Sequence, residues 1–195
     1  ANNETGVMFP VPELAELAHE QGALFHCDAV QVVGKIPMAL SQTRIDMLSC
    51  SAHKFHGPKG VGCLWLRRGT RFRPLLRGGH QAHGRRAGTE NISGIVGMGA
   101  ASELAQVHLP GMAQISQLRD RLEQHLQATI PAVTVMGGSQ PRVPGTLNLA
   151  FECIEGEAIL LLMNQAGIAA SSGSACTSGS LEPSHVMRAM NIPYT

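Results

Sequence analysis

Apolar residues in the first half of the chain alternate between a helical spacing and short continuous runs. Residues 11–22 read "VPELAELAHEQG", with Pro12 near the start and Gly22 at the end, and this pattern predicts a helix. Apolar runs predict three strands, at 23–31, 45–54 and 60–68. Short runs separated by helices or turns are typical of a mainly parallel α/β sheet buried on both faces, with the third strand either parallel or antiparallel.

The second half carries helices first and then two short strands. Apolar residues at helical spacing predict helices over 92–108 and 114–128, the second with one apolar stripe made of Ile115, Leu118, Leu122 and Leu126. Further patterns predict strands at 132–137 and 145–151, a buried helix at 155–167 and a helix at 182–190. Two lobes follow from this order, with a boundary near residues 95–110.

Composition narrows the class of protein. The chain has 195 residues, 44% of them hydrophobic and 15% charged, with a net charge of +1. These values indicate a globular protein with no general attraction to nucleic acid, and no apolar run is long enough to span a membrane. The 5 cysteines show no pairing rhythm or zinc-ligand spacing, which favours a reducing cytoplasm over a disulfide framework. We expect Cys27, Cys50 and Cys63 to be inert thiols in the core.

An aspartate and a lysine close two of the predicted strands. Asp28 ends the first apolar run and Lys54 ends the second, and ligands of open α/β sheets bind outside the carboxyl ends of strands. The pair suits pyridoxal 5′-phosphate (PLP), with Lys54 forming a Schiff base and Asp28 holding the pyridine nitrogen protonated. A structural ion pair is the alternative. Gln31 could reach the ring oxygen, and Ser51 and His53 are suitable phosphate donors.

Two glycine-containing segments flank this chemistry. In "HGPKG", Gly57 and Gly60 predict a sharp turn with backbone angles that other residues resist. The basic stretch from Arg67 to Arg86 suits a dimer interface or an approach for phosphate, and a solvated arginine face is the next choice. A nucleic-acid patch is disfavoured because Phe72 is the one aromatic residue there for base stacking.

A single thiol lies in a segment of small residues, "ASSGSACTSGSLEPSH", at 170–185. Cys176 has no bulky neighbours in sequence to pack against it. We interpret the segment as one that presents the thiol to a partner, because Ser and Gly give the chain reach at the expense of local order. An exposed linker with an incidental cysteine is the alternative.

Several motifs together resemble the cysteine desulfurases, of the NifS type associated with nitrogen fixation more than the IscS type. They are "NNETG", "CDAVQ" with "VGK", "SAHKFHGPKG", "RRAGTEN" and "SSGSACTSGSLEPS". The resemblance implies the PLP-dependent class-V aminotransferase family, with the aspartate-aminotransferase-like fold type I, helices on both faces of the sheet and a homodimer with PLP near the subunit interface. Residues 1–100 would be the C-terminal part of the large PLP-binding domain, and 101–195 a small α/β domain.

The resemblance also implies a role for each matching residue. Catalysis would fall to Lys54 and Cys176. The cofactor would be bound by Asn3, Asp28, Gln31, Ser51, His53, Lys54 and Thr89, the last reaching the phosphate of the other subunit. L-cysteine would replace Lys54 on PLP, and the freed Lys54 would move the Cα proton. The Cys176 thiolate would then attack the substrate sulfur, which releases alanine and leaves a persulfide.

Sulfur would pass from Cys176 to an iron–sulfur scaffold protein, with a transient contact between the persulfide and the metal cluster as the only metal role. A selenocysteine lyase and a non-catalytic sulfur carrier are the alternative functions. Family segments that hold an upstream hydroxyl residue, a ring-stacking histidine and a downstream arginine do not match any part of this chain. We therefore expect these 195 residues alone to be incompetent as an enzyme.

Overall fold

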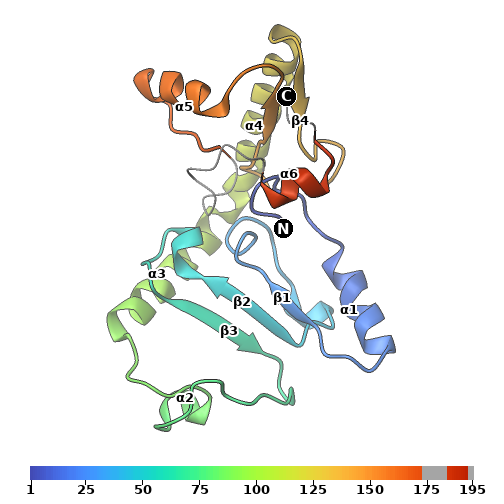
Figure 1. The fold of residues 1–195 in the computed structure, drawn as a ribbon. Helices are drawn as coiled ribbons and strands as arrows, with labels where there is room; N and C mark the ends of the chain where they lie inside the picture. The colour runs from blue at the N-terminus through green and yellow to red at the C-terminus, as the bar shows by residue number, and fades with distance from the viewer. Residues whose placement is uncertain (173–183, 193–195) are drawn as a thin grey trace. The chain divides into compact units, whose positions relative to one another are not determined.

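The computed structural model describes residues 1–172 and 184–192, which form two compact units (Figure 1). One unit is Phe9–Met112, and the other joins Ala1–Met8 to Ala113–Thr195. Cys176 lies outside the described residues. No helix in the described part is both long enough and apolar enough to cross a bilayer.

The first unit contains a three-stranded sheet in the order β1-β2-β3. Strand β1 (His26–Asp28) runs parallel to β2 (Met47–Ser51), and β3 (Gly62–Leu66) is antiparallel to β2. The three predicted strands are therefore confirmed, and the third is the antiparallel one. Each strand is shorter than the apolar run that predicts it, because the ends of the runs form turns.

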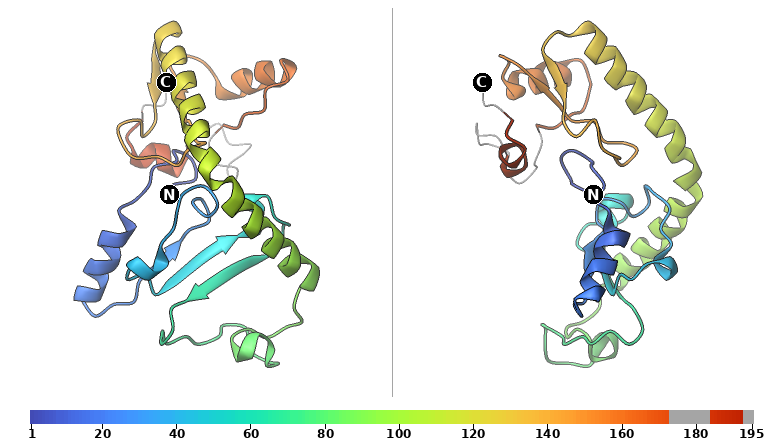
Figure 2. Two further views of the ribbon diagram at one scale, coloured as in Figure 1. Left: turned by 180° about the vertical axis from the view of Figure 1, so that it is seen from behind. Right: turned by 90° about the vertical axis from the view of Figure 1, so that its right-hand side faces the viewer.

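Two helices pack on the same face of this sheet. Helix α1 (Val11–Glu20) buries Ala15 in a cluster with Leu48, against which Cys27, Cys50 and Trp65 also pack. Helix α3 (Ile92–His108) buries Ala101 in a second cluster, which also contacts Cys50. Seen from behind in Figure 2, α3 crosses the sheet on this side.

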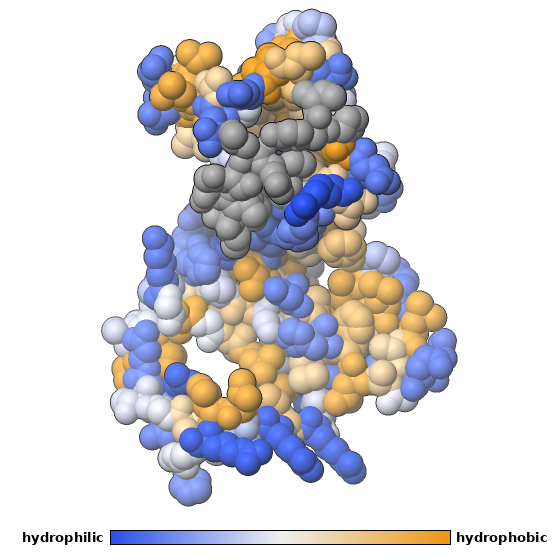
Figure 3. All heavy atoms as spheres, viewed as in Figure 1, coloured by the Kyte–Doolittle hydropathy of each residue, from blue (hydrophilic) through white to orange (hydrophobic). Residues whose placement is uncertain are grey.

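The other sheet face is open in the described structure. Side chains alternate along a strand, so His26, Asp28 and Ser49 lie on the face opposite the core residues. Leu64, the partner of Ser49 on β3, is 42% exposed there. Apolar side chains are visible over this part of the molecule in Figure 3. Helices on both faces, as predicted, are thus not seen within these residues.

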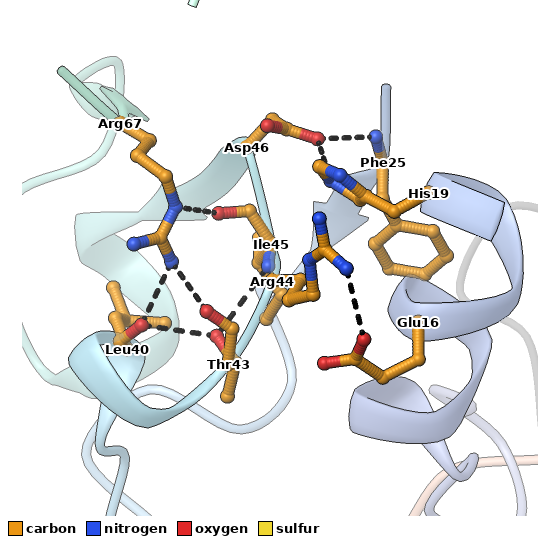
Figure 4. Close-up of polar contacts among 9 residues, drawn as sticks. All are labelled: Glu16, His19, Phe25, Leu40, Thr43, Arg44, Ile45, Asp46 and Arg67. Atoms are coloured by element: carbon orange, nitrogen blue, oxygen red, sulfur yellow. Dashed lines mark hydrogen bonds and ion pairs between the residues drawn. The ribbon is translucent and has the colours of Figure 1, made fainter. Parts of the chain in front are cut away.

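A network of polar contacts fixes the entry to β2 (Figure 4). The guanidinium of Arg67 donates to the carbonyl oxygens of Leu40, Thr43 and Ile45, each at 2.8 Å. It also lies 5.3 Å from the ring centroid of Trp65, within the range of a cation–π contact. Arg67 is therefore a structural residue, whereas the sequence grouped it with a basic surface.

Asp46 is the buried acidic member of the same region. Its Oδ2 accepts from the Phe25 amide at 2.8 Å and lies 2.8 Å from Nε2 of His19. Burial alone raises the pKa of Asp46, but these hydrogen bonds and the charges of His19 and Arg67 outweigh it, so the pKa is lowered. The carboxylate thus stays charged in the fold and ties α1 to the start of the sheet.

The second unit packs a two-stranded antiparallel sheet with helices. Its elements are α4 (Met112–Thr129), β4 (Val133–Val135), β5 (Leu149–Phe151), α5 (Gly156–Gln165) and α6 (His185–Ala189). Met136 and Val143 are its most buried large side chains. The prediction that 155–167 is buried is wrong in this structure, because Leu161 and Leu162 of α5 are 60% and 66% exposed.

Short helical turns complete the chain. They are η1 (Leu40–Gln42), η2 (Ala52–Phe55), α2 (Gln81–Gly84) and η3 (Leu109–Gly111). Of these, η2 follows β2 directly and carries Lys54.

We predict that Arg67→Met in the intact protein lowers stability by about 2–4 kcal/mol, because three carbonyl groups lose a charged donor. The neighbouring Arg68 is exposed and provides the matched control, and Arg68→Met should change stability by less than about 0.5 kcal/mol. Urea unfolding of both variants checks this. Equal effects of the two substitutions would contradict the structural role of Arg67.

The lowered pKa of Asp46 leads to a prediction for how the stability of the fold depends on pH. Its folded pKa lies below the unfolded value of about 3.9, so the carboxylate stabilises the fold above about pH 4. This contribution is lost as the pH falls through the folded pKa. We expect Asp46→Asn to destabilise the protein near neutral pH, with a difference from the parent that shrinks below about pH 4. Thermal unfolding across this range measures it, and a constant difference at all pH values refutes it.

Candidate functional site

The carboxyl ends of β1 and β2 meet at one edge of the sheet. Asp28 is the last residue of β1 and lies opposite Ser49, and Ser51 is the last residue of β2 on the same face. The Ala29 amide continues the ladder by donating to the Ser49 carbonyl at 2.9 Å. Parallel pairing thus brings the Asp28 carboxylate and the Ser51 hydroxyl to the same edge.

Lys54 lies on the helical turn η2 instead of at a strand end. Ala52 and Phe55, three residues apart, are both buried against Ala101 of α3. Residues three apart in such a turn point the same way, so the intervening His53 and Lys54 remain exposed. The lysine is therefore presented by a backbone that its buried neighbours hold in place.

The predicted phosphate donors contact each other. Ser51 Oγ lies 2.8 Å from Nδ1 of His53, and both side chains are at the end of β2. An imidazole with one N–H and a hydroxyl carry two donors between them, and this contact uses one of the two. The pair therefore offers one donor to an anion while the contact is intact, and two when it opens.

Asp28 and Gln31 occupy the turn that follows β1. Oδ1 of Asp28 accepts from the Val30 amide at 2.9 Å, which fixes the side chain, while Oδ2 has no hydrogen bond within the described residues. Oε1 of Gln31 accepts from Nζ of Lys35 at 3.3 Å. Burial, and after it the charge of Lys54, lowers the pKa of Lys35. Lys35 is thus an element of the site that we did not assign from the sequence.

The "HGPKG" turn is built differently from the prediction. Gly60 has a φ of +79°, as expected, but the residue in the left-handed region at the end of η2 is His56, with a φ of 68°. Gly57 is required for space instead, because an added Cβ would lie 2.8 Å from the Ala52 Cβ and 3.2 Å from the Ala101 Cβ. Close packing against η2 explains this glycine.

Asn3 and Thr89 do not belong to β1, β2, η2 or the turn that follows β1. Asn3 is exposed and belongs to the second unit, in a turn where Asn2 Oδ1 accepts from the amides of Glu4 and Thr5, each at 2.9 Å. Thr89 is exposed in the connection between α2 and α3. Cys176, for which the resemblance implies catalytic and cluster-contact roles, falls outside the described residues.

Glu4 is a second residue that we did not assign from the sequence. It is 5% exposed, and its carboxylate accepts from Oγ of Ser184 at 2.6 Å. Ser184 also caps α6 by accepting from the Met187 amide at 3.2 Å. The "NNETG" turn is therefore fixed to the start of α6. The sequence shows only an acidic residue within a polar motif, and its burial follows from the fold.

Two of the other thiols lie on the core face of the sheet. Burial raises the pKa values of Cys27 and Cys50, which agrees with inert thiols on the core face. Cys63 is exposed, so its expected core position is wrong. Within the described part of the chain, no group of three or more His, Cys, Asp or Glu residues could hold a metal ion.

The whole arrangement has the features of a known family. Residues 1–194 match the aminotransferase class-V family, and the chain belongs to it. Class-V aminotransferases are PLP-dependent enzymes, which confirms the predicted α/β fold family and the cofactor, whereas helices on the second face of the sheet stay a prediction.

Individual relatives narrow the resemblance. All 195 residues are 85% identical to a cysteine desulfurase of Klebsiella pneumoniae, and the match spans 49% of that protein. The chain is also 62% identical to the cysteine desulfurase NifS of Azotobacter vinelandii. That alignment of 196 positions covers the whole chain and 49% of the relative. The chain thus spans about half the length of these relatives, and its resemblance to the desulfurases is confirmed.

Solved structures show the same likeness at the level of the fold. A NifS-like protein from Rickettsia africae has a TM-score of 0.83 and 31% identity, over 89% of this chain and 48% of its own. SspA in complex with cysteine has a TM-score of 0.78 and 31% identity, over 99% of this chain and 53% of its own.

The residues at the sheet edge fit PLP. They comprise an acceptor, Oδ2 of Asp28, for a protonated ring nitrogen, and the Ser51 and His53 donors for a phosphate. The Lys54 amine has no ion pair or hydrogen bond among the described residues, so it is available for an aldehyde. The set therefore supplies partners for the ring nitrogen, the phosphate and the aldehyde, and the Ser51–His53 contact must open for both side chains to donate to the phosphate.

The packing of η2 can be tested at two glycines. We predict that Gly57→Ala destabilises the protein by about 1–3 kcal/mol, because the new methyl forces Ala52 and α3 apart. Gly99 in α3 has no atom within 4 Å of an added Cβ, so Gly99→Ala should stabilise by about 0.5–1 kcal/mol. Urea unfolding of both variants should show changes of opposite sign in the free energy of unfolding. A neutral Gly57→Ala would show that η2 is not packed in this way.

Proposed function

We propose that the intact protein is a PLP-dependent cysteine desulfurase, which takes sulfur from L-cysteine and releases L-alanine. The observation that carries the proposal is the exposed Lys54 on η2, the turn that directly follows β2, whose carboxyl end with Ser51 lies at the same sheet edge as Asp28 of β1. The 85% identity to a cysteine desulfurase and the likeness to SspA in complex with cysteine support the substrate.

Each residue at the edge has a task in this reaction. When bound, PLP withdraws electrons from the Cα of an amino acid joined to it. Asp28 holds the ring nitrogen protonated, Gln31 contacts the ring oxygen, and Ser51 and His53 bind the phosphate. Lys54 anchors the cofactor and, once released by the substrate, takes and returns the Cα proton. The family resemblance implies that Asn3 orients the cofactor and the substrate carboxylate.

The sulfur leaves the substrate on Cys176. Its thiolate attacks the substrate sulfur, the carbon–sulfur bond breaks, and the persulfide is carried to an acceptor. We propose an iron–sulfur scaffold protein as acceptor, with nitrogenase cluster assembly as the pathway. The 62% identity to NifS of Azotobacter vinelandii supports this pathway. Reducing conditions in the cytoplasm would keep this thiol free.

We also propose a homodimer with Thr89 contributed to the phosphate of the other subunit. Apolar side chains of α3 support further packing in the intact protein, since Ile92, Val96 and Val107 are 65%, 67% and 73% exposed. The neighbouring basic stretch also exposes Leu75, at 91%.

Chemical trapping of the intact natural protein tests the anchor. Borohydride reduction followed by peptide mass spectrometry should find a pyridoxyl group on Lys54 and none on Lys35 or Lys59, the two other lysines of the sequence. Lys54→Ala should abolish the adduct. Folded protein supplied with PLP that yields no adduct would overturn the proposed function.

The same preparation tests the thiol. After addition of L-cysteine we expect a persulfide on Cys176 and release of alanine, both lost in Cys176→Ala. The exposed Cys63 provides the control, because Cys63→Ala should retain the persulfide and the alanine release. A persulfide on Cys63 instead of Cys176 would overturn the assignment of Cys176 as the sulfur-accepting thiol.

A further inference from the structure

Lys35 is a half-buried lysine whose ammonium is held by a side chain of the candidate site. Nζ donates to Oε1 of Gln31 at 3.3 Å, across four residues of the turn that follows β1. The Val33 and Ile36 amides donate to the Ala29 and Val32 carbonyls, at 3.2 Å each, so two successive hydrogen-bonded turns join Gln31 to Lys35. The measured contact shows that these turns bring the two side chains together.

The backbone of this turn is fixed against η2. Gly34 has a φ of +76°, and an added Cβ would lie 3.1 Å from the Cβ atoms of both Phe55 and Ala105. Gly34 thus contacts the residue after Lys54 on one side and α3 on the other. The position of Lys35 follows from this contact, because it is the next residue along.

The chemistry of the two side chains decides which end of Gln31 faces outward. An ammonium has three donors and no acceptor, so its partner on Gln31 must be the carbonyl oxygen. The amide nitrogen of Gln31, with two donors, is then the end that remains for another group. Without Lys35 the amide could rotate by half a turn and present its oxygen instead.

We propose that Lys35 is a positioning residue of the cofactor site, which fixes the Gln31 amide so that its NH₂ group donates to the ring oxygen of PLP. This inference rests on the proposed function and deepens it. The phenolic oxygen of PLP accepts hydrogen bonds, so a Gln31 turned the other way would set two oxygens against each other. Lys35 itself makes no contact with the cofactor in this proposal.

The charge of Lys35 supports the same placement. Burial is the main cause that lowers its pKa, and the charge of Lys54 is the second cause, which shows that the two amines are within electrostatic reach. A half-buried ammonium with a neutral partner is costly compared with one in water. A positioning role at the cofactor site explains why a charged Lys35 lies near Lys54 despite this cost.

The experiment compares PLP affinity among variants of the intact natural protein. The variants are Lys35→Met, Lys35→Arg, Gln31→Leu, the double variant Lys35→Met with Gln31→Leu, and Lys59→Met. Lys59 is an exposed lysine of the turn after η2 and serves as the matched control. The apparent Kd for PLP and the visible absorption of the bound cofactor are measured, together with the Tm of each protein without PLP.

We expect Lys35→Met to weaken PLP binding about 5-fold, the value of one hydrogen bond, and to change the absorption in the same direction as Gln31→Leu. Lys35→Arg keeps a donor and should stay within about 2-fold of the parent. In the Gln31→Leu background, Lys35→Met should have no further effect on the Kd, because Lys35 acts through Gln31. Lys59→Met should bind PLP like the parent.

A further variant keeps the test decisive if Lys35→Met does not fold. Gln31→Glu retains an oxygen partner for Lys35 but removes the NH₂ donor, so we expect a stable protein with at least about 5-fold weaker PLP binding. Unchanged affinity in Gln31→Glu overturns the inference, as do additive effects of Lys35→Met and Gln31→Leu. A parent protein that fails to bind PLP at all refutes the proposed function instead, which separates the two failures.

Discussion

The parallel register of β1 and β2 is the constraint on which the candidate site depends. Asp28 lies opposite Ser49, and a slip by one residue would turn every side chain of β1 to the other face. Asp28 would then point into the cluster that holds Leu48, where an unpaired carboxylate is costly. Core burial on one face therefore determines which side chains reach the ligand side.

Polar contacts outside the site secure that register. Arg67 closes the ladder with its amide, which donates to the Asp46 carbonyl at 2.8 Å, and its guanidinium holds the chain that leads into β2. Asp46 in turn binds the Phe25 amide just before β1. Both strands thus enter the sheet at positions fixed by charged groups, while their carboxyl ends carry the exposed functional residues.

Much of this arrangement could be predicted from the sequence. The three apolar runs predicted the strands, and Asp28 does end β1, as expected from where ligands bind. Lys54 was expected at a strand end but lies on η2, because Ala52 and Phe55 pack against α3. Arg67 could not be assigned, because its carbonyl partners are brought near only by the fold. Lys35 is only four residues from Gln31, but its burial depends on the packing of the turn against η2 and α3. Gly57 was predicted for the wrong reason, since close packing against Ala101 is a tertiary property.

The distribution of buried charge separates structural from functional groups in the first unit. Asp46 and Arg67 are each satisfied by several strong hydrogen bonds, as expected for charges that hold a fold together. Lys35 has one neutral oxygen at 3.3 Å and a like charge nearby, so its contacts do little to offset the cost of burial. Buried charges that lack good partners are found mostly at functional sites. Lys35 lies beside the residues that fit PLP. Its weak compensation is therefore better explained by a role at the cofactor than by a role in folding.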